Sequence, residues 1–513
     1  MSKRIILKTG IILFGTGLIY LFYLPVINGY FLAEDYAWWP YVKDRSFLSV
    51  LTYFFTSPSR VLAGFYHPLV GLSYWFNVKF FGMNPLGFHL TNLLIHMGNF
   101  LLVVAIANFF FKRRWLAFLA GFLFIIFPFH SEAVAWIDGR HDLLMTFFYL
   151  LSFYTFLRWG KSGKTFILGL SVFSFLLALT AKEMAITLPL VLTAYLILRC
   201  QASQHRVLDS LRRTVWYWLV LGFYFILHAF YVGHLNPFSA ASHLGIIIPR
   251  VLIFYLIFLA FAILFFLLFV KKKIFTKDNL ILVPFFGLLV GIFYLPAAFT
   301  PTQERYLYLP STIASIYMVN LFFLFWTSRW VKKKFIKALM LFCLILLSAI
   351  SIKYLVNRVY DWKRASEIAG QVVNDFRIYA RDIPREATIY FLNLPDNYHG
   401  SYIFRTHVKE AMEYGVSKEF RKIVVLPQTL GVGDSSAQIM SKSNFTLKSK
   451  DGYLIFAPTI SRVLSSGEAR VETEDYQLLV ENKKTLSLTL KNDYLGKEGV
   501  FFFKYNTVLS WVR

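Results

Sequence analysis

Two adjacent carboxylates, Glu34 and Asp35, follow the first long apolar segment of the chain, in the run Gly29-Tyr-Phe-Leu-Ala-Glu-Asp-Tyr36. A carboxylate that is held in position can take a proton from a reacting group, so this pair predicts general-base chemistry. The alternative interpretation is a solvated helix end that carries no chemistry.

Charged side chains, histidines and tyrosines recur in the polar segments between the later apolar runs. Charged groups close to membrane hydrocarbon are costly unless they are paired or face water. Any one of these segments alone is explained by ordinary solvated charges, but their convergence at one membrane face predicts a polar site. The candidate residues of that site are Glu132, Arg140, His141, Asp142, Lys182, Arg305 and Tyr306.

Arg305, Lys182 and Arg140 are the candidates for binding an anionic group. A planar guanidinium can bind phosphate oxygens through two hydrogen bonds at once. Arg305 is the first choice because it lies at the mouth of an apolar run. The alternative is ion pairing within the protein, of Lys182 with Glu183 or of Arg140 with nearby aspartates.

Metal binding and disulfide bonding receive little support from the sequence. Histidines and carboxylates share the polar segments, but no tight ligand spacing joins them. A divalent cation stays possible, no metal ligand is assigned, and no other cofactor is predicted. Only Cys200 and Cys343 are present, so we expect no disulfide framework.

The polar segments separate long apolar runs. The chain of 513 residues is 57% hydrophobic and has a mean hydropathy of +0.55, which indicates a protein that crosses a membrane several times. A run of about 20 apolar residues spans a bilayer, and by that criterion we predict an all-α membrane domain of about eleven helices. The predicted spans are 5–24, 88–111, 116–129, 143–157, 166–179, 185–198, 216–232, 246–270, 280–298, 309–325 and 336–356.

The net charge of +25 reflects topology and not a nucleic-acid partner. Lys and Arg gather in alternate junctions, and such residues stay on the cytoplasmic side during membrane insertion. The pattern predicts a cytoplasmic N-terminus, a first segment that stays as an anchor, and an extracytoplasmic region after the last span. The remaining positive charge suits anionic lipid at the membrane surface.

The composition changes after residue 356, where long apolar runs end and short strand-like runs begin. We therefore predict two domains, a membrane domain of residues 1–356 and a small soluble α+β domain of residues 357–513. Two helices are expected, at 361–375 and 407–413. The expected strands are 387–394, 422–426, 453–457, 476–480, 485–490 and 500–505.

Four sequence blocks resemble one known family when taken in order: Asn84-Pro-Leu-Gly-Phe-His-Leu-Thr-Asn-Leu-Leu-Ile-His96, Glu132-Ala-Val-Ala-Trp-Ile-Asp-Gly-Arg-His-Asp142, Thr180-Ala-Lys-Glu-Met-Ala-Ile-Thr-Leu-Pro189 and Glu304-Arg-Tyr-Leu-Tyr-Leu-Pro310. They are similar to blocks of the GT-C membrane glycosyltransferases, nearest the O-mannosyltransferases with tetratricopeptide repeats and their bacterial relatives. No helical repeat of about 34 residues is visible in residues 357–513.

The resemblance implies a polyprenyl-phosphate-linked sugar as donor and an extracytoplasmic protein or polysaccharide as acceptor. It also implies that an acidic residue of the first outer loop is the general base, and that role falls on Asp35, with Glu34 as its neighbour. The expected location is the inner (plasma) membrane. Two alternatives stay open: a polymerase or ligase of lipid-linked glycans, and a transporter of lipid-linked sugars.

Overall fold

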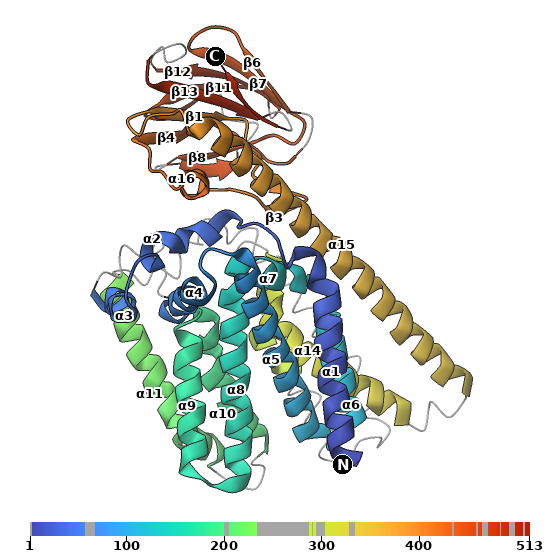
Figure 1. Ribbon diagram of the computed structural model, residues 1–513. Coiled ribbons are helices and arrows are strands. Elements are labelled where there is room, and N and C mark those ends of the chain that lie inside the picture. The colour runs from blue at the N-terminus through green and yellow to red at the C-terminus, as the bar shows by residue number, and fades with distance from the viewer. Residues whose placement is uncertain are drawn as a thin grey trace. The chain divides into compact units, whose positions relative to one another are not determined.

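The computed structural model describes residues 3–56, 67–199, 205–232, 287–289, 291–293, 303–327, 334–432, 435–457, 460–463, 470–482, 484–491, 498–505 and 508–512 (Figure 1). The chain divides into two compact units. The first comprises Met1–Leu24 and Tyr41–Arg358, and the second comprises Pro25–Pro40 and Val359–Arg513. The acidic loop, which we define as Pro25–Pro40, thus belongs to the second unit although it is early in the sequence.

The first unit is built of helices. Its core comes from α5 packing against α6 and α8, α8 against α9, α10 against α11, and α14 against α6. The helices and short 3-10 segments are α1 (Lys3–Tyr23), α2 (Trp39–Val42), α3 (Phe47–Thr56), α4 (Pro68–Phe81), α5 (Pro85–Phe111), α6 (Arg114–Ile125), η5 (Pro128–His130), α7 (Ser131–Ala135), η6 (Ile137–Gly139), α8 (Arg140–Ser162), α9 (Thr165–Leu179), η7 (Glu183–Thr187), α10 (Leu188–Arg199), α11 (Arg206–Val232), η9 (Glu304–Leu307), α14 (Tyr308–Thr327) and the first part of α15 (Lys334–Ala380).

Local sequence signals set the ends of these helices. Asn84 caps α5, because its side-chain oxygen accepts a hydrogen bond from the Leu86 N–H at 3.1 Å, and Pro85 occupies the first turn. Helix α8 ends at Gly163, whose φ of +67° lies in the left-handed region that glycine adopts readily. The first turn of α8 follows α7 and η6 directly in the chain, and the candidate site lies there.

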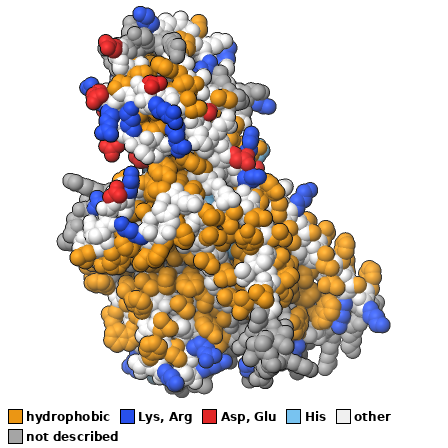
Figure 2. Space-filling view, in the orientation of Figure 1, with side chains coloured by type: hydrophobic (Ala, Val, Ile, Leu, Met, Phe, Trp, Pro, Cys, Tyr) orange, Lys and Arg blue, Asp and Glu red, His pale blue; other side chains and the backbone are white. Residues whose placement is uncertain are grey.

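Several helices of the first unit are apolar enough for a membrane. Among the described residues, three have the length and composition to cross one, namely Pro85–Phe111, Glu304–Thr327 and Lys334–Ala380. A fourth is possible if the pair Arg114–Ile125 and Pro128–Ala135, bent by 58°, counts as one span. Figure 2 shows hydrophobic side chains over most of the visible face of this unit, as expected of a surface in contact with lipid.

The predicted helical membrane part is confirmed as a mostly helical region with apolar helices. The count of eleven spans stays a prediction, since the predicted span 246–270 and most of 280–298 lie outside the described residues.

The second unit is rich in β-structure. A four-stranded sheet has the order β14-β13-β1-β4, in which β1 is parallel to both neighbours, and a five-stranded antiparallel sheet has the order β10-β11-β12-β7-β6. The strands are β1 (Thr388–Leu392), β2 (Asn397–Tyr398), β3 (Ser401–Tyr402), β4 (Lys422–Val425), β5 (Gln428–Thr429), β6 (Ser435–Ile439), β7 (Asn444–Ser449), β8 (Tyr453–Ala457), β9 (Ile460–Val463), β10 (Arg470–Glu472), β11 (Tyr476–Asn482), β12 (Thr485–Leu490), β13 (Val500–Tyr505) and β14 (Leu509–Val512).

Two helices flank these sheets, α16 (Val408–Val416) and the last part of α15. The core joins the two larger sheets through Tyr390, Leu447, Leu488 and Phe502. All six predicted strands and the predicted helix 407–413 are confirmed within a few residues. The predicted helix 361–375 is not separate, because it continues the apolar segment 336–356 as one helix of 47 residues, with no proline or glycine between them.

Candidate functional site

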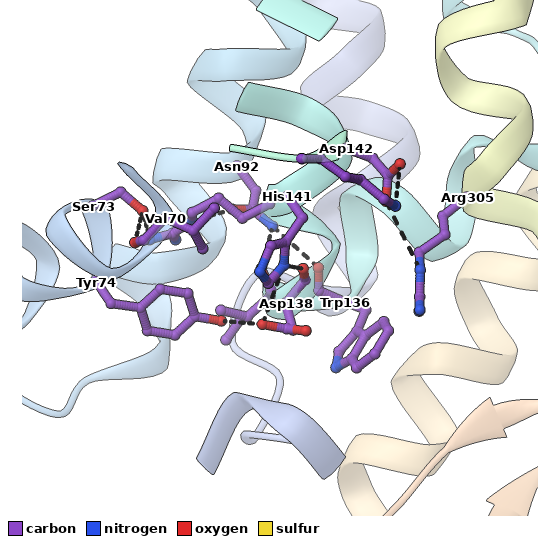
Figure 3. Close-up of polar contacts among 12 residues, drawn as sticks. Val70, Ser73, Tyr74, Asn92, Trp136, Asp138, His141, Asp142 and Arg305 are labelled. Carbon is purple, nitrogen blue, oxygen red and sulfur yellow. Dashed lines mark hydrogen bonds and ion pairs between the residues drawn. The ribbon is translucent and has the colours of Figure 1, made fainter. Parts of the chain in front are cut away.

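Arg305 lies on η9, which leads directly into α14. Its Nη1 donates a hydrogen bond to Oε1 of Glu132 at 2.9 Å, and its backbone N–H donates to Oε2 of the same carboxylate at 3.2 Å. Its Nε is 3.8 Å from Oδ2 of Asp142, a contact drawn as a dashed line in Figure 3. Two carboxylates from different helices therefore hold one guanidinium.

Asp142, on the first turn of α8, also pairs with Lys182. The Lys182 Nζ donates to both carboxylate oxygens of Asp142 at 2.7 Å. The side chain of Asp142 is 2% exposed and that of Lys182 is 12% exposed, so this ion pair is largely shielded from water. Shielding strengthens the electrostatic attraction and makes the loss of either partner costly.

Aromatic rings complete this arrangement. The ring of Tyr306 lies 4.5 Å from the Lys182 Nζ and 5.4 Å from the Arg305 guanidinium, which is also 4.8 Å from the ring of Trp136. Aromatic faces attract cations at these distances. We call Glu132, Asp142, Lys182, Arg305 and Tyr306 the cationic cluster. Its two positive and two negative charges balance, so the cations are held in place without a net charge.

Glu304 fixes the segment that carries Arg305. One carboxylate oxygen accepts a hydrogen bond from the Ser131 hydroxyl at 3.1 Å, and the other accepts from the Tyr354 hydroxyl at 3.0 Å and from the Arg358 Nε at 3.2 Å. Tyr354 and Arg358 are one turn apart on α15. The short helix η9 is thus tied to α7 on one side and to α15 on the other.

The Arg140 side chain donates hydrogen bonds to other parts of the protein. This side chain is fully buried, its Nε donates to the Asn92 side chain at 2.8 Å, and its Nη2 donates to the Phe88 carbonyl at 2.9 Å. A further nitrogen donates to the side chain of Asn77. The expectation that Arg140 binds a substrate stays a prediction, and this geometry favours a structural role that joins α8 to α4 and α5.

His141 and Asp138 lie beside the cationic cluster (Figure 3). The His141 Nδ1 is 2.9 Å from the Asp138 backbone oxygen and 3.5 Å from its carboxylate. Burial lowers the pKa of His141 to about 4 from 6.5, and the Asp138 charge opposes that shift only in part. The imidazole is therefore neutral at pH 7. The neighbouring His67 ring hydrogen-bonds to Glu183 at 2.9 Å, so Glu183 pairs with His67 while Lys182 pairs with Asp142.

Glu34 and Asp35 lie on η2 (Ala33–Trp38) in the second unit. The Asp35 side chain is not solvated. It is 1% exposed, and its Oδ2 accepts a hydrogen bond from the Leu32 N–H at 2.8 Å, which fixes the start of the short helix. The Glu34 side chain is 30% exposed, and its Oε1 is 3.7 Å from Nη1 of Arg405. Glu34 is therefore the member of the pair that a substrate can reach.

Sequence comparisons give similarity over part of the chain. The chain is 36% identical over 133 residues to the mouse protein O-mannosyl-transferase TMTC1, a match that covers 24% of this chain and 14% of that relative. It is 36% identical over 148 residues to the Drosophila melanogaster Tmtc2 protein and 35% identical over 143 residues to human TMTC4, covering 28% and 24% of this chain. The chain is similar to the protein O-mannosyl-transferases. The resemblance expected from the four blocks is confirmed, while no family model matches the chain.

The chain matches 14%, 16% and 19% of the length of these three O-mannosyl-transferases. Weaker structural likenesses extend further along it. ArnT from Cupriavidus metallidurans bound to undecaprenyl phosphate is 13% identical, with a TM-score of 0.45, and the match covers 94% of this chain and 98% of that one. The Archaeoglobus fulgidus oligosaccharyltransferase tethered to an acceptor peptide is 12% identical, with a TM-score of 0.44, covering 81% and 63%.

The sequence analysis did not single out the partners of Glu304 and of Glu34. Tyr354 falls in the predicted span 336–356 and Arg358 in the segment after it. Their spacing puts both on one helix face and could have indicated a polar contact. Arg405, which faces Glu34, carried no signal in its sequence surroundings. Within the described ranges, no group of three or more His, Cys, Asp or Glu side chains could hold a metal ion.

Proposed function

We propose that this protein is a membrane glycosyltransferase that moves a sugar from a polyprenyl-phosphate carrier to a hydroxyl group of an extracytoplasmic protein. The cationic cluster is the observation that carries the proposal. It is supported by the similarity to proteins named protein O-mannosyl-transferases and by apolar helices of spanning length. The proposed location is the plasma membrane, with the N-terminus in the cytoplasm and the second unit outside it.

The cationic cluster would bind the phosphate of the donor. Negative charge develops on the leaving phosphate as the bond to the sugar breaks, and cations fixed in advance stabilise that charge most effectively. Arg305 and Lys182 are fixed by Glu132 and Asp142, so they need little rearrangement when charge develops. Tyr306 lies against both cations and would line the same surface.

The acidic loop would supply the base. The acceptor hydroxyl oxygen attacks the anomeric carbon, the carbon–oxygen bond to phosphate breaks, and the bonding electrons leave with the polyprenyl phosphate. The hydroxyl proton passes to a carboxylate of the loop. We assign this role to Glu34, because Asp35 is buried and accepts a backbone hydrogen bond. Asp35 would instead hold the loop in shape. A single displacement of this kind inverts the anomeric configuration.

The test compares wild type with Glu34→Gln and Asp35→Asn in detergent, supplied with polyprenyl-phosphate mannose and a peptide that contains serine and threonine. Release of polyprenyl phosphate and mannosylation of the peptide are measured. We expect Glu34→Gln to lower kcat by about 100-fold or more, as removal of a general base does. Asp35→Asn keeps a side-chain oxygen that can accept the hydrogen bond from the Leu32 N–H, so it should keep most of the wild-type kcat and melting temperature.

Glu367→Gln is the matched control, because Glu367 is an exposed glutamate of the same unit, and its ion-pair partners among the described residues are Lys363 and Arg364 on α15. Wild-type turnover in both Glu34→Gln and Asp35→Asn would refute the assignment of the base to the acidic loop. Turnover of a diphosphate-linked oligosaccharide in place of the monophosphate donor would refute the proposed donor and favour a glycan polymerase or ligase.

A further inference from the structure

A second polar cluster lies within the second unit, around the exposed member of the acidic pair. We call Glu34, Asp396, Arg405 and Gln428 the Glu34 cluster. The Gln428 side-chain amide donates to the Arg405 carbonyl at 2.7 Å, and the Ala33 N–H donates to the Ile403 carbonyl at 2.8 Å. These contacts hold residues from the acidic loop and from the segment 396–405 side by side.

Each side chain of the Glu34 cluster has a buried polar atom that is left without a hydrogen bond among the described residues. These atoms are Oε2 of Glu34, Oδ1 of Asp396, Nε of Arg405 and Oε1 of Gln428. Asp396 is 5% exposed and Gln428 is 1% exposed. Buried polar networks are normally satisfied, because a buried donor or acceptor without a hydrogen bond has lost its water without replacement. Four such atoms in one place indicate a site prepared for a ligand.

The cluster opens to solvent between the Glu34 carboxylate and the Arg405 guanidinium. The two side chains are 30% and 26% exposed, and the 3.7 Å between Oε1 and Nη1 is longer than a hydrogen bond. The Arg405 guanidinium lies 4.3 Å from the Tyr402 ring, which limits its movement. A ligand that donates to a carboxylate and accepts from a guanidinium would satisfy both groups.

The backbone on both sides of this opening is held in a costly conformation. Ala33, next to Glu34, has a φ of +42°, and Arg405 has a φ of +46°, both in the left-handed region that residues with a side chain rarely adopt. Such a conformation is unfavourable and persists where the surrounding structure enforces it. Here it brings a carboxylate and a guanidinium face to face.

We propose that Glu34, Arg405 and Asp396 form the acceptor site, which binds a serine or threonine residue of a polypeptide. The hydroxyl group donates to Glu34, and the backbone carbonyl of the same residue accepts from Arg405. Asp396 is a positioning residue that acts on Arg405 through the electrostatic attraction between its carboxylate and the guanidinium. This inference rests on the proposed function, because a hydroxyl acceptor is what that function requires.

The environment of Asp396 agrees with this role. Burial raises the pKa of its carboxyl and the Glu34 charge adds to the rise, while the Asn397 hydrogen bond and the Arg405 guanidinium lower it. Asp396 therefore lies within the electrostatic reach of both groups that would contact the acceptor. Its Oδ2 accepts from Asn397 at 3.0 Å, and its backbone N–H donates to the Thr429 carbonyl at 2.8 Å, so its position is fixed.

The experiment measures KM separately for the peptide and for polyprenyl-phosphate mannose in full-length Arg405→Gln, Arg405→Lys and Asp396→Asn. Loss of a hydrogen bond to a charged group should raise the KM of Arg405→Gln for the peptide by about 10- to 100-fold and leave its KM for the donor unchanged. Arg405→Lys, which keeps the charge, should recover part of the loss. Arg470→Gln is the matched control, because Arg470 is an exposed arginine of the same unit.

Melting temperatures of all variants separate a binding defect from misfolding, and Arg405→Lys serves if Arg405→Gln does not fold. An unchanged KM for the peptide in folded Arg405→Gln would overturn the inference. Replacement of the peptide by a saccharide acceptor that depends on Arg405 in the same way would overturn the assignment to a polypeptide. Failure of the proposed function looks different, because wild type would then release no polyprenyl phosphate from the donor with any acceptor.

Discussion

The pair of Arg305 and Glu132 lets stability be separated from catalysis. The Glu132 side chain is 6% exposed, and the Arg305 side chain is 17% exposed. Arg305→Gln leaves a buried carboxylate without its charged partner, which costs about 3 kcal/mol of unfolding free energy. Glu132→Gln should cost less, about 1–2 kcal/mol, because Arg305 keeps Asp142 at 3.8 Å.

The double variant Arg305→Gln/Glu132→Gln should be more stable than the sum of the two single changes predicts. No charge is left unpaired when both partners are neutral, and we expect a coupling energy of about 1–3 kcal/mol. Turnover should behave in the opposite way. Both variants without Arg305 lose its positive charge at the leaving phosphate, so each should lose about 100- to 1000-fold in kcat.

Thermal unfolding in detergent and release of polyprenyl phosphate are the two assays for this cycle. Arg212→Gln is the control, because Arg212 is an exposed arginine of the same unit. Additive stability losses would show that Arg305 and Glu132 do not interact. If the double variant regained turnover together with stability, Arg305 would act only through folding, and its assignment as the phosphate ligand would be refuted.

Three further predictions follow from other contacts. Arg358→Gln and Glu304→Gln should each destabilise the protein by about 1–3 kcal/mol, and the double variant should lose little more because both break the same contact; additive melting-temperature losses would contradict this. Because the pKa of His141 is lowered to about 4, unfolding takes up a proton between about pH 4 and pH 6.5. The contribution of the neutral His141 to stability is therefore present above pH 6.5 and is lost as the pH falls toward 4. His141→Gln should flatten the dependence of melting temperature on pH in that window, and an unchanged slope would count against it. The topology can be tested with single cysteines in a protein whose two native cysteines are replaced by serine. The exposed variant Ser441→Cys should react with a membrane-impermeant maleimide in intact cells, and the exposed variant Ser162→Cys should react only after permeabilisation. The reverse labelling would refute the proposed topology.

The sequence could predict six strands of the second unit because alternation of apolar and polar residues is a local signal. Strand β12 (Thr485–Leu490) was predicted because its leucines occupy every second position, and these are the buried ones. Strand β7 (Asn444–Ser449) has the same burial pattern but was missed, because lysine and serine surround its two buried apolar residues. The packing of the acidic loop with this unit could not be predicted, because that contact depends on residues far along the chain.

The candidate site was predictable as a set of residues but not as a set of pairs. The polar segments indicated Glu132, Asp142, Lys182, Arg305 and Tyr306, which the structure brings together. The partner of Lys182 could not be read from the sequence, because Asp142 lies on another helix while Glu183 is its neighbour in the chain. The burial of Asp35 could not be read from the sequence either, because it follows from a backbone hydrogen bond and from packing around the short helix η2.

The membership of Pro25–Pro40 in the second unit has a consequence for biosynthesis. Phe31 and Trp38 of this segment are fully buried, and Phe31 lies edge-on to Tyr414. The ribosome makes this segment at the start of translation, but its packing partners emerge only near the end. Until then these aromatic side chains lack their native neighbours. The nascent chain therefore has a long interval in which a chaperone could shield the loop, and a C-terminal truncation would leave an apolar surface uncovered.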